Sequence, residues 1–257
     1  AHLRAVTATR SAKTALTDDL GTLTYGELAQ RVRRFAGALT ALGLRREERV
    51  LLLAHDSTDW VVGFLGALHA GVVPVAVNTL LPARDVAYML GDSRAQAAIV
   101  SGALLPVLQD AMALAPHAVQ HVVVSRGQAL PTGAHDMAAL VDAATEAAPA
   151  DTHGDEPAFW LYSSGSTGAP KGTVHTQANL FWTAELYGRA VLGLRETDVV
   201  FSAAKLFFAY GLGNALSFPL SVGATVVLMA ERPTPQACFK RFTEQRPTVF
   251  FGAPTGY

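Results

Sequence analysis

The stretch from Ser163 to Gly172, with the sequence SSGSTGAPKG, constrains this chain more than any other segment. It combines three glycines, four hydroxyl residues and one lysine. An apolar run at 158–162 precedes it and Thr-Val-His at 173–175 follows it, so two strand-like runs flank a loop rich in donors. Glycines let backbone N–H groups form a concave anion nest, hydroxyl groups donate to phosphate oxygens, and lysine adds a mobile positive charge. The segment is therefore predicted to bind a polyphosphate.

This loop differs from the P-loop of nucleoside triphosphatases, which reads G-x-x-x-x-G-K-[ST] and opens a helix. Counted from Gly165, the second glycine of that pattern falls on Pro170, and Lys171 is followed by Gly172 instead of a hydroxyl residue. A true P-loop triphosphatase remains an alternative. A flexible linker is disfavoured because Pro-Lys-Gly between two strands is not typical of linkers.

Composition excludes several classes of protein. The chain has 257 residues, of which 50% are hydrophobic, so it can bury a large core in one or two lobes. Its net charge of −1 gives no general attraction to nucleic acid or to an anionic membrane, and neither is expected as a partner. Cys238 is the lone cysteine, which excludes an intramolecular disulfide and fits a cytoplasmic location. Two uncharged runs, 60–77 and 207–230, contain glycine and proline and are each expected to form a buried helix and a buried strand.

Apolar runs of strand length alternate with helical periodicity along the chain. This alternation predicts an α/β fold of layered sheets with mostly parallel strands. Strands are expected at 49–54, 72–77, 97–100, 121–124, 199–202, 225–229 and 248–251. Helices are expected to begin near Thr24, which forms a capping-box pattern with Glu27, near Ser57 and near Pro82. After the loop, one apolar helix face is marked by Leu180, Phe181, Ala184, Tyr187, Val191 and Leu194.

The stretch 128–156 is rich in alanine, with scattered Pro, Gly, Asp and Thr, and has the weakest pattern in the chain. A boundary between lobes is expected there. Residues 1–155 are predicted to form an N-terminal α/β lobe. Residues 156–257 are predicted to begin a second α/β lobe that carries the predicted phosphate loop and a second segment, rich in aromatic residues.

That second segment is KLFFAYGLGN at 205–214, which follows a predicted strand and leads into an apolar helix. Phe208 and Tyr210 can wall a flat slot, and Ala209 and Gly211 leave space between them. Plain core packing is the alternative, which composition alone favours.

The loop resembles the phosphate loop of adenylate-forming enzymes, the superfamily of acyl- and aryl-CoA ligases, luciferases and peptide-synthetase adenylation domains. The superfamily pattern is [ST]-[SG]-G-[ST]-T-G-x-P-K-G, and every position of 163–172 fits it. The segment at 205–214 resembles the benzoate-CoA ligase branch, which includes 4-hydroxybenzoate-CoA ligases. Six further segments of the chain resemble the same branch, at 78–81, 88–90, 93–96, 100–102, 171–176 and 252–255. The resemblance extends over essentially the whole chain from Ser11 onward.

By this resemblance, the fold is the N-terminal domain of an adenylate-forming enzyme, incomplete at its C-terminal side and without the small C-terminal domain. The implied activity joins an aryl carboxylate to ATP to form acyl-AMP and pyrophosphate, after which the thiol of CoA displaces AMP. The implied nucleotide-binding residues are Ser163, Ser164, Gly165, Ser166, Thr167, Gly168, Lys171 and Gly172. The implied substrate-binding residues are Phe208, Ala209, Tyr210, Gly211, Gly252, Ala253, Pro254 and Tyr187.

Lys171 is the one catalytic group that the resemblance assigns, as a cation that screens phosphate charge. Many members carry histidine where Phe208 stands, so the acid pocket departs from the common pattern. His175 could contact a ligand, but a structural histidine near a strand end is the preferred interpretation. The principal catalytic lysine of the family is expected beyond Tyr257.

The resemblance further implies ATP, Mg²⁺ and CoA, with the magnesium ligands mostly outside this chain and no metal ligand assigned within it. Family members are longer, and their adenine-binding Tyr-Gly-x-Thr-Glu segment, ribose-binding Asp, hinge and C-terminal lysine have no counterpart here. The 257 residues are therefore expected to be an N-terminal portion that is inactive alone. An adenylation domain that loads a carrier protein and a non-catalytic lobe that binds nucleotide or acid remain alternatives. A homodimer is also open, and the ring substituent and the CoA-binding residues are undetermined.

Overall fold

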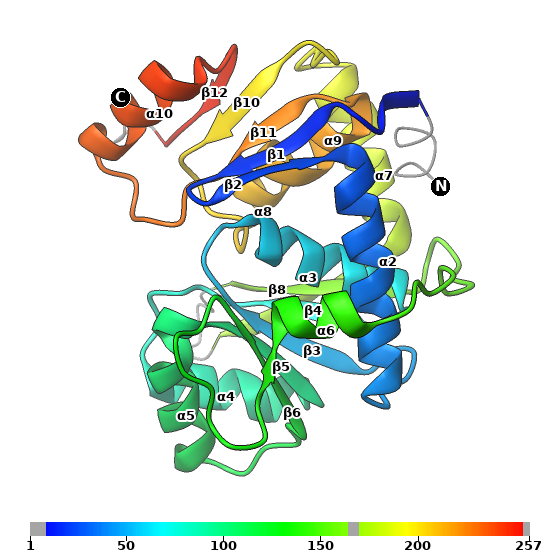
Figure 1. The fold of residues 1–257 in the computed structure, drawn as a ribbon, viewed down its shortest axis with the longest axis vertical. Helices are drawn as coiled ribbons and strands as arrows, with labels where there is room; N and C mark the ends of the chain where they lie inside the picture. Colours follow the sequence, from blue (N-terminus) through cyan, green and yellow to red (C-terminus); the bar gives the residue numbers. More distant parts are fainter. Residues whose placement is uncertain (1–8, 164–169, 254–257) are drawn as a thin grey trace. The chain divides into compact units, whose positions relative to one another are not determined.

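The computed structural model describes residues 9–163 and 170–253, which form two β-sheets with helices packed on them (Figure 1). These residues fall into two compact units, each assembled from separated segments. Unit 1 contains the described residues up to Gln30, His55–Val61 and the described residues from Ala178 onward. Unit 2 contains Arg31–Ala54 and the described residues of Val62–Gln177. The division does not follow the expected boundary at residue 155, because the first strands group with the C-terminal segments.

Unit 2 is built on a seven-stranded sheet with the order β7-β6-β5-β3-β4-β8-β9. All its pairings are parallel except that of β8 with β9. Its strands are β3 (Arg49–Leu53), β4 (Val73–Ala76), β5 (Ala97–Ser101), β6 (His121–Ser125), β7 (His135–Asp136), β8 (Pro157–Ser163) and β9 (Lys171–Thr176). Its helices are most of α2 (Tyr25–Ala41) and of α3 (Thr58–His69), with α4 (Ala83–Ser93), η1 (Gly102–Leu104), α5 (Leu105–Leu114) and α6 (Met137–Ala143).

Helices cover both faces of this sheet, as a parallel sheet requires. On one face α4 and α5 lie side by side and bury a cluster that includes Leu51 and Val100 from the strands (Figure 1). On the other face Gly63 of α3 lies against side chains of β3, β5 and α6. The ring of Phe64 meets that of Phe159 on β8 edge to face, with centroids 5.4 Å apart. The sheet therefore forms the middle of an α/β/α sandwich.

Unit 1 is built on a five-stranded sheet with the order β12-β10-β11-β1-β2. Its strands are β1 (Thr14–Asp18), β2 (Gly21–Thr24), β10 (Val199–Ser202), β11 (Thr225–Val227) and β12 (Val249–Phe251). Its helical segments are the first turns of α2 and α3, with α7 (Gln177–Thr183), η2 (Ala184–Arg189), α8 (Ala209–Leu212), η3 (Gly213–Ser217), α9 (Phe218–Val222) and α10 (Pro235–Gln245).

Neighbouring residues of β10 point to opposite faces of this sheet, as strand geometry requires. Val200 packs with Ala184 of η2 and Phe218 of α9. Phe201 packs with Val227 of β11 and Ala237 of α10. Among the described strands of this sheet, β1 and β2 form the one antiparallel pair. Strands β1, β10, β11 and β12 therefore all end at the same edge of the sheet, and the segments that follow them begin there.

The expected layered α/β fold with mostly parallel sheets is confirmed, and most elements lie within a few residues of their predicted positions. Both uncharged runs fold as a helical stretch followed by a strand, α3 with β4 and α8–α9 with β11. Among the described residues, no helix has the length and apolar character needed to cross a membrane.

The expectation for 128–156 was incomplete. This stretch contains β7 and α6, and the side chain of Asp136 caps α6 by accepting from the backbone N–H of Ala139. Its later part packs on α2, where the N–H of Ala147 donates to the carbonyl of Arg33. A Cβ on Gly37 would lie 2.1 Å from the carbonyl oxygen of Thr145, so this contact requires glycine. Alanine-rich composition hides this packing because backbone atoms make it.

The apolar face predicted after the loop is only partly buried. Ala184 and Leu194 are buried, whereas Phe181, Tyr187 and Val191 are exposed. The chain changes from α-helix to π-helix at Ala184, and a π-helical segment shifts the alignment of residues spaced for an α-helix. Strands β1 and β2 were also not predicted. They are short, and threonines occupy much of both strands.

The N-terminus of α2 has a complete capping box. The N–H of Thr24 donates to Oε2 of Glu27 at 2.8 Å, and the N–H of Glu27 donates to Oγ1 of Thr24 at 3.2 Å. We expect Thr24→Ala to lower the free energy of unfolding by about 1 kcal/mol because it leaves an N–H group of the first turn without its partner. Thr24→Ser keeps the hydroxyl and should stay near the wild-type value in urea unfolding. Equal losses in both variants would contradict the capping role.

Candidate active site

The ends of the predicted phosphate loop are held by the β8–β9 hairpin of unit 2. Ser163, the last residue of β8, pairs in register with Lys171, the first residue of β9. Lys171 is exposed, so its ammonium group is accessible. Five of the predicted nucleotide-binding residues lie outside the described residues: Ser164, Gly165, Ser166, Thr167 and Gly168. The described ends thus place one hydroxyl and one cation opposite each other where the strands meet the loop.

Aromatic side chains brace this hairpin. A Cβ on Gly172 would lie 3.2 Å from the ring of Trp160 and 3.4 Å from that of Tyr162, so glycine lets these rings pack closely. The hydroxyl of Tyr162 donates to Oδ2 of Asp92 at 2.6 Å. His175 stacks on Phe159 with ring centroids 4.5 Å apart and an interplanar angle of 3°, and burial lowers its pKa. This packing fits the structural interpretation of His175.

The predicted acid-binding residues lie in unit 1, at the edge where the parallel strands end. Ala209, Tyr210 and Gly211 belong to α8, which follows β10, and Phe208 is its N-cap residue. Gly252 and Ala253 follow β12, while Pro254 lies outside the described residues. Tyr210 meets Phe251 edge to face at 6.5 Å, which brings the two predicted segments together.

The aromatic side chains here offer half-exposed surface. Phe208 is 49% exposed and Tyr210 is 52% exposed, whereas Phe207 is buried against the ring of Phe208 at 4.6 Å. Phe208 and Tyr210 therefore present partly exposed side chains at this edge. Tyr187 lies on η2, where its ring packs at 5.7 Å from that of Phe218 on α9.

Gly211 fixes the shape of this turn. A Cβ there would lie 2.0 Å from the carbonyl oxygen of Lys205, a distance that no side chain can accept. The N–H of Phe208 also donates to that carbonyl at 3.0 Å. The backbone of the predicted acid-binding segment is therefore folded tightly onto Lys205.

Sequence reasoning missed a group of charged residues beside this segment. Asp56 is buried at 3% exposure, and its two carboxylate oxygens accept from the N–H of Leu206 at 3.2 and 3.3 Å. The ammonium of Lys205 donates to the carbonyl of Met229, to that of Glu231 at 2.6 Å and to that of Ala230 at 3.5 Å. These contacts join segments that are distant in sequence, so no local pattern could have revealed them.

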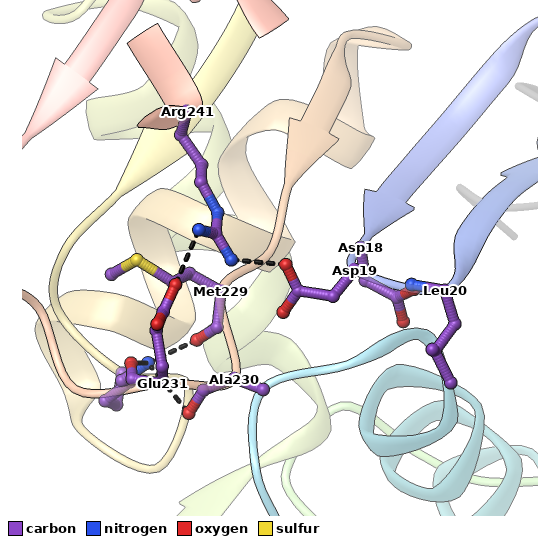
Figure 2. Close-up of polar contacts among 8 residues, drawn as sticks. Asp18, Asp19, Leu20, Met229, Ala230, Glu231 and Arg241 are labelled. Carbon is purple, nitrogen blue, oxygen red and sulfur yellow. Dashed lines mark hydrogen bonds and ion pairs between the residues drawn. The ribbon is translucent and has the colours of Figure 1, made fainter. Parts of the chain in front are cut away.

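A second part of this charged group surrounds Arg241 of α10. Its guanidinium pairs with Asp19, in the β1–β2 turn, and with Glu231 at 2.6 Å. Figure 2 shows Arg241 between these two carboxylates, with the carbonyl groups of Met229 and Ala230 beside Glu231. The side chain of Arg241 is only 4% exposed, whereas those of Asp19 and Glu231 are 39% and 54% exposed, so a buried guanidinium meets two carboxylates that reach solvent. Carboxylates satisfy the guanidinium from two sides, which is how buried arginines are normally stabilised.

Burial shifts the pKa values of Asp56 and Lys205, the two charged groups next to the predicted acid-binding segment. It raises the pKa of Asp56 to about 6, against the nearby charge of Lys205 and the N–H of Leu206, which favour the ionised form. Burial likewise lowers the pKa of Lys205, against the charges of Asp56 and Glu231. Desolvation is the largest cause of the pKa shift in both residues, so burying each charged form costs free energy.

Two cavities lie away from these residues. One, of about 380 Å³ in unit 1, is lined by Arg10, Arg189, Leu194, Arg195, Glu196, Ser221 and Val222. The other, of about 340 Å³ in unit 2, lies between α5 and the segment before β7. Neither is lined by a predicted site residue.

Across 9–163 and 170–253, no group of three His, Cys, Asp or Glu side chains is placed to hold a metal ion.

A family model described as "AMP-binding enzyme" matches residues 3–257. The chain belongs to this family. The benzoate–CoA ligase of Thauera aromatica is 54% identical over 99% of this chain and 48% of its own length. The 4-hydroxybenzoate–CoA/benzoate–CoA ligase of Rhodopseudomonas palustris is 44% identical over 96% of this chain and 46% of its own length. The chain thus spans about half the length of these curated relatives.

A crystal structure of an anthranilate CoA ligase in complex with anthranoyl-AMP matches the fold with a TM-score of 0.95 at 36% identity. The match covers 100% of this chain and 49% of that one. The predicted resemblance to the benzoate-CoA ligase branch of adenylate-forming enzymes is therefore confirmed.

The close approach at Gly211 gives a direct test of the backbone of the predicted site. We expect Gly211→Ala to lower the free energy of unfolding by about 1–3 kcal/mol or more, because the new methyl group collides with the carbonyl of Lys205. Gly91→Ala, on α4, is the matched control, since the nearest atom outside the helix backbone would be the carbonyl oxygen of Pro116, at 4.0 Å from the new Cβ. This control should be neutral or stabilising by about 0.5–1 kcal/mol. If Gly211→Ala leaves the thermal unfolding transition unchanged, the turn is not held this tightly.

The raised pKa of Asp56 predicts a pH dependence of stability. Between the unfolded pKa of 3.8 and the folded value of about 6, the folded protein binds the proton more strongly, so this residue adds stability as the pH falls. We compare the Tm of the wild type with that of Asp56→Asn at two pH values. The wild-type Tm minus the variant Tm should be about 2–4 °C larger at about pH 5 than at about pH 7. Asp110→Asn, at an exposed position of α5, serves as the control. A difference that stays constant or falls would contradict the shift.

Proposed function

We propose that the protein activates a benzoate-like aryl carboxylate and transfers it to CoA. A carboxylate oxygen attacks the α-phosphorus of ATP, the bond to pyrophosphate breaks, and an aryl-AMP forms. The thiol of CoA then attacks the carbonyl carbon, a C–S bond forms, AMP leaves and the thiol proton is released. Adenylation makes this possible because a free carboxylate is a poor electrophile, whereas AMP is a good leaving group.

The observation that carries this proposal is the 54% identity to a benzoate–CoA ligase over 99% of the chain. The second relative is named for 4-hydroxybenzoate and benzoate, and the anthranilate CoA ligase was solved with anthranoyl-AMP. All three names describe aromatic acids with a carboxyl group directly on the ring. This agreement supports an aryl substrate for the protein to which this chain belongs.

The ATP-binding role is proposed for the hairpin of unit 2. The sequence between Ser163 and Lys171 contains hydroxyl residues and glycines, which suit the β- and γ-phosphates. The exposed ammonium of Lys171 suits the screening of charge that develops on the departing pyrophosphate. Mg²⁺ would supply further positive charge at the phosphates, while the hydroxyl residues and Lys171 would bind the phosphates directly. Among the described residues, no group of three His, Cys, Asp or Glu side chains is placed to hold the ion.

The acid-binding role is proposed for the carboxyl edge of the sheet in unit 1. The half-exposed rings of Phe208 and Tyr210 offer apolar surface to a planar ring, at roughly 25 cal/mol per Å² buried. Gly252 and Ala253 follow Phe251, the residue that Tyr210 contacts, and their small size leaves space for the ring. Tyr187 remains a proposed contact through its exposed ring on η2.

A substrate panel with the intact gene product tests the reaction. We expect pyrophosphate release that depends on benzoate, 4-hydroxybenzoate or anthranilate, and an aryl-CoA thioester when CoA is added. Aryl-AMP that forms but does not pass to CoA would favour the carrier-loading alternative. ATP hydrolysis without any acid, or activity restricted to aliphatic acids, would overturn the proposal.

Two substitutions test the division of roles. Lys171→Ala should slow pyrophosphate release by about 10²-fold, because it removes one cation at the developing charge, and should leave acid preference unchanged. Tyr210→Ala should change the ratio of kcat/KM between benzoate and its analogues by roughly 10-fold, because it removes part of a pocket wall, and should leave the KM for ATP unchanged. Lys240→Ala, an exposed lysine of α10, is the matched control. Equal effects of both substitutions on acid preference would show that the assigned roles are wrong.

A further inference from the structure

The acid-binding segment is held in place by two side chains that are not themselves part of it. Lys205 lies between the end of β10 and the start of α8, and its ammonium is bound by backbone carbonyls just after β11. The next residue, Leu206, donates its N–H to the buried carboxylate of Asp56. Two successive residues are therefore fixed by contacts to two other segments of unit 1.

Lys205 is also hydrogen-bonded, through its backbone, to the residues proposed to face the acid. The carbonyl of Lys205 accepts from the N–H of Phe208, and the carbonyl of Phe208 accepts from the N–H of Leu212 at 2.8 Å. Gly211 packs against the same Lys205 carbonyl with no room for a methyl group. A shift of the backbone at Lys205 would thus displace the rings of Phe208 and Tyr210 as well.

The two charges are costly to bury, which argues against a role in stability alone. Desolvation raises the pKa of Asp56 and lowers that of Lys205, so both residues are driven toward their neutral forms. Apolar residues of similar size often replace buried ion pairs without loss of stability. What apolar side chains cannot do is bind an N–H group and three carbonyl groups at fixed positions.

We propose that Asp56 and Lys205 are positioning residues, which hold the segment from Phe208 to Gly211 in the geometry that selects the aryl acid. This inference rests on the aryl-acid site proposed above, and it adds the source of that site's precision. Neither residue is placed in contact with substrate. Their removal should loosen the pocket wall and so affect acid binding and discrimination more than ATP use.

Steady-state kinetics of the intact gene product with Lys205→Met and Asp56→Asn test the proposal. Methionine keeps the unbranched shape and most of the length of lysine without its charge, and asparagine keeps an oxygen that can accept from the N–H of Leu206. We expect the KM for benzoate to rise roughly 10-fold in Lys205→Met, with a smaller rise in Asp56→Asn, while the KM for ATP changes little. The differences in kcat/KM among benzoate, 4-hydroxybenzoate and anthranilate should become smaller. Lys240→Met is the control, because that lysine is exposed on α10.

The double variant measures whether the two residues act together. If both residues hold one turn, the KM for benzoate in the double variant should rise about as much as in Lys205→Met alone. Independent effects would instead add as free energies, so the two fold-changes in KM would multiply. Additive effects would show that the two residues act separately and would overturn the paired role.

The remaining outcomes also decide the matter. A wild-type protein that uses none of the three acids would overturn the proposed function and this inference with it. An active wild type whose folded variants keep their KM for benzoate and their acid preference would overturn the inference alone. So would equal increases in the KM for acid and for ATP. If a single variant fails to fold, the other decides, and if neither folds, Asp56 and Lys205 serve stability and the positioning role is wrong.

Discussion

Parallel pairing places the ends of four strands of unit 1 along one edge, and the proposed acid-binding surface depends on this constraint. The chain leaves the edge after β1, β10, β11 and β12, and each departing segment contributes a different group. The turn after β1 gives Asp19, and the segment after β11 gives carbonyl groups and Glu231. Ligands bind in open α/β sheets at this carboxyl edge, because only there do several loops meet with free backbone and side-chain groups.

Buried charge at this edge fixes backbone positions that apolar packing would leave variable. The ammonium of Lys205 and the carboxylate of Asp56 each replace lost water with hydrogen bonds to main-chain groups. Arg241 has two carboxylate partners in the same region. Such a network costs desolvation free energy, but it determines geometry more narrowly than hydrophobic contacts do. The half-exposed side chains of Phe208 and Tyr210 would then present a defined surface to the proposed aryl acid.

Local patterns predicted most of the elements. The capping box of Thr24 and Glu27 marked the start of α2, and apolar runs marked β3, β5, β6 and β10 to within a residue or two. Helix α6 was missed because it is short and its alanine-rich sequence has little amphipathic contrast. The burial pattern expected after the loop failed because a π-helical segment interrupts it. In each case the deciding contact involved backbone atoms or a change in helical spacing, which side-chain periodicity does not report.

Short motifs were enough to establish the family and the resemblance to aryl-CoA ligases, because glycine, hydroxyl residues and lysine at fixed spacing carry that chemistry locally. They also indicated which segments bear the proposed ATP and acid contacts. The folded chain was needed to show that the first two strands belong with the C-terminal segments, and that Asp56 meets Leu206 across 150 positions of sequence. Contacts of that range arise from how parallel strands are ordered in a sheet, and strand order is not encoded in any local pattern.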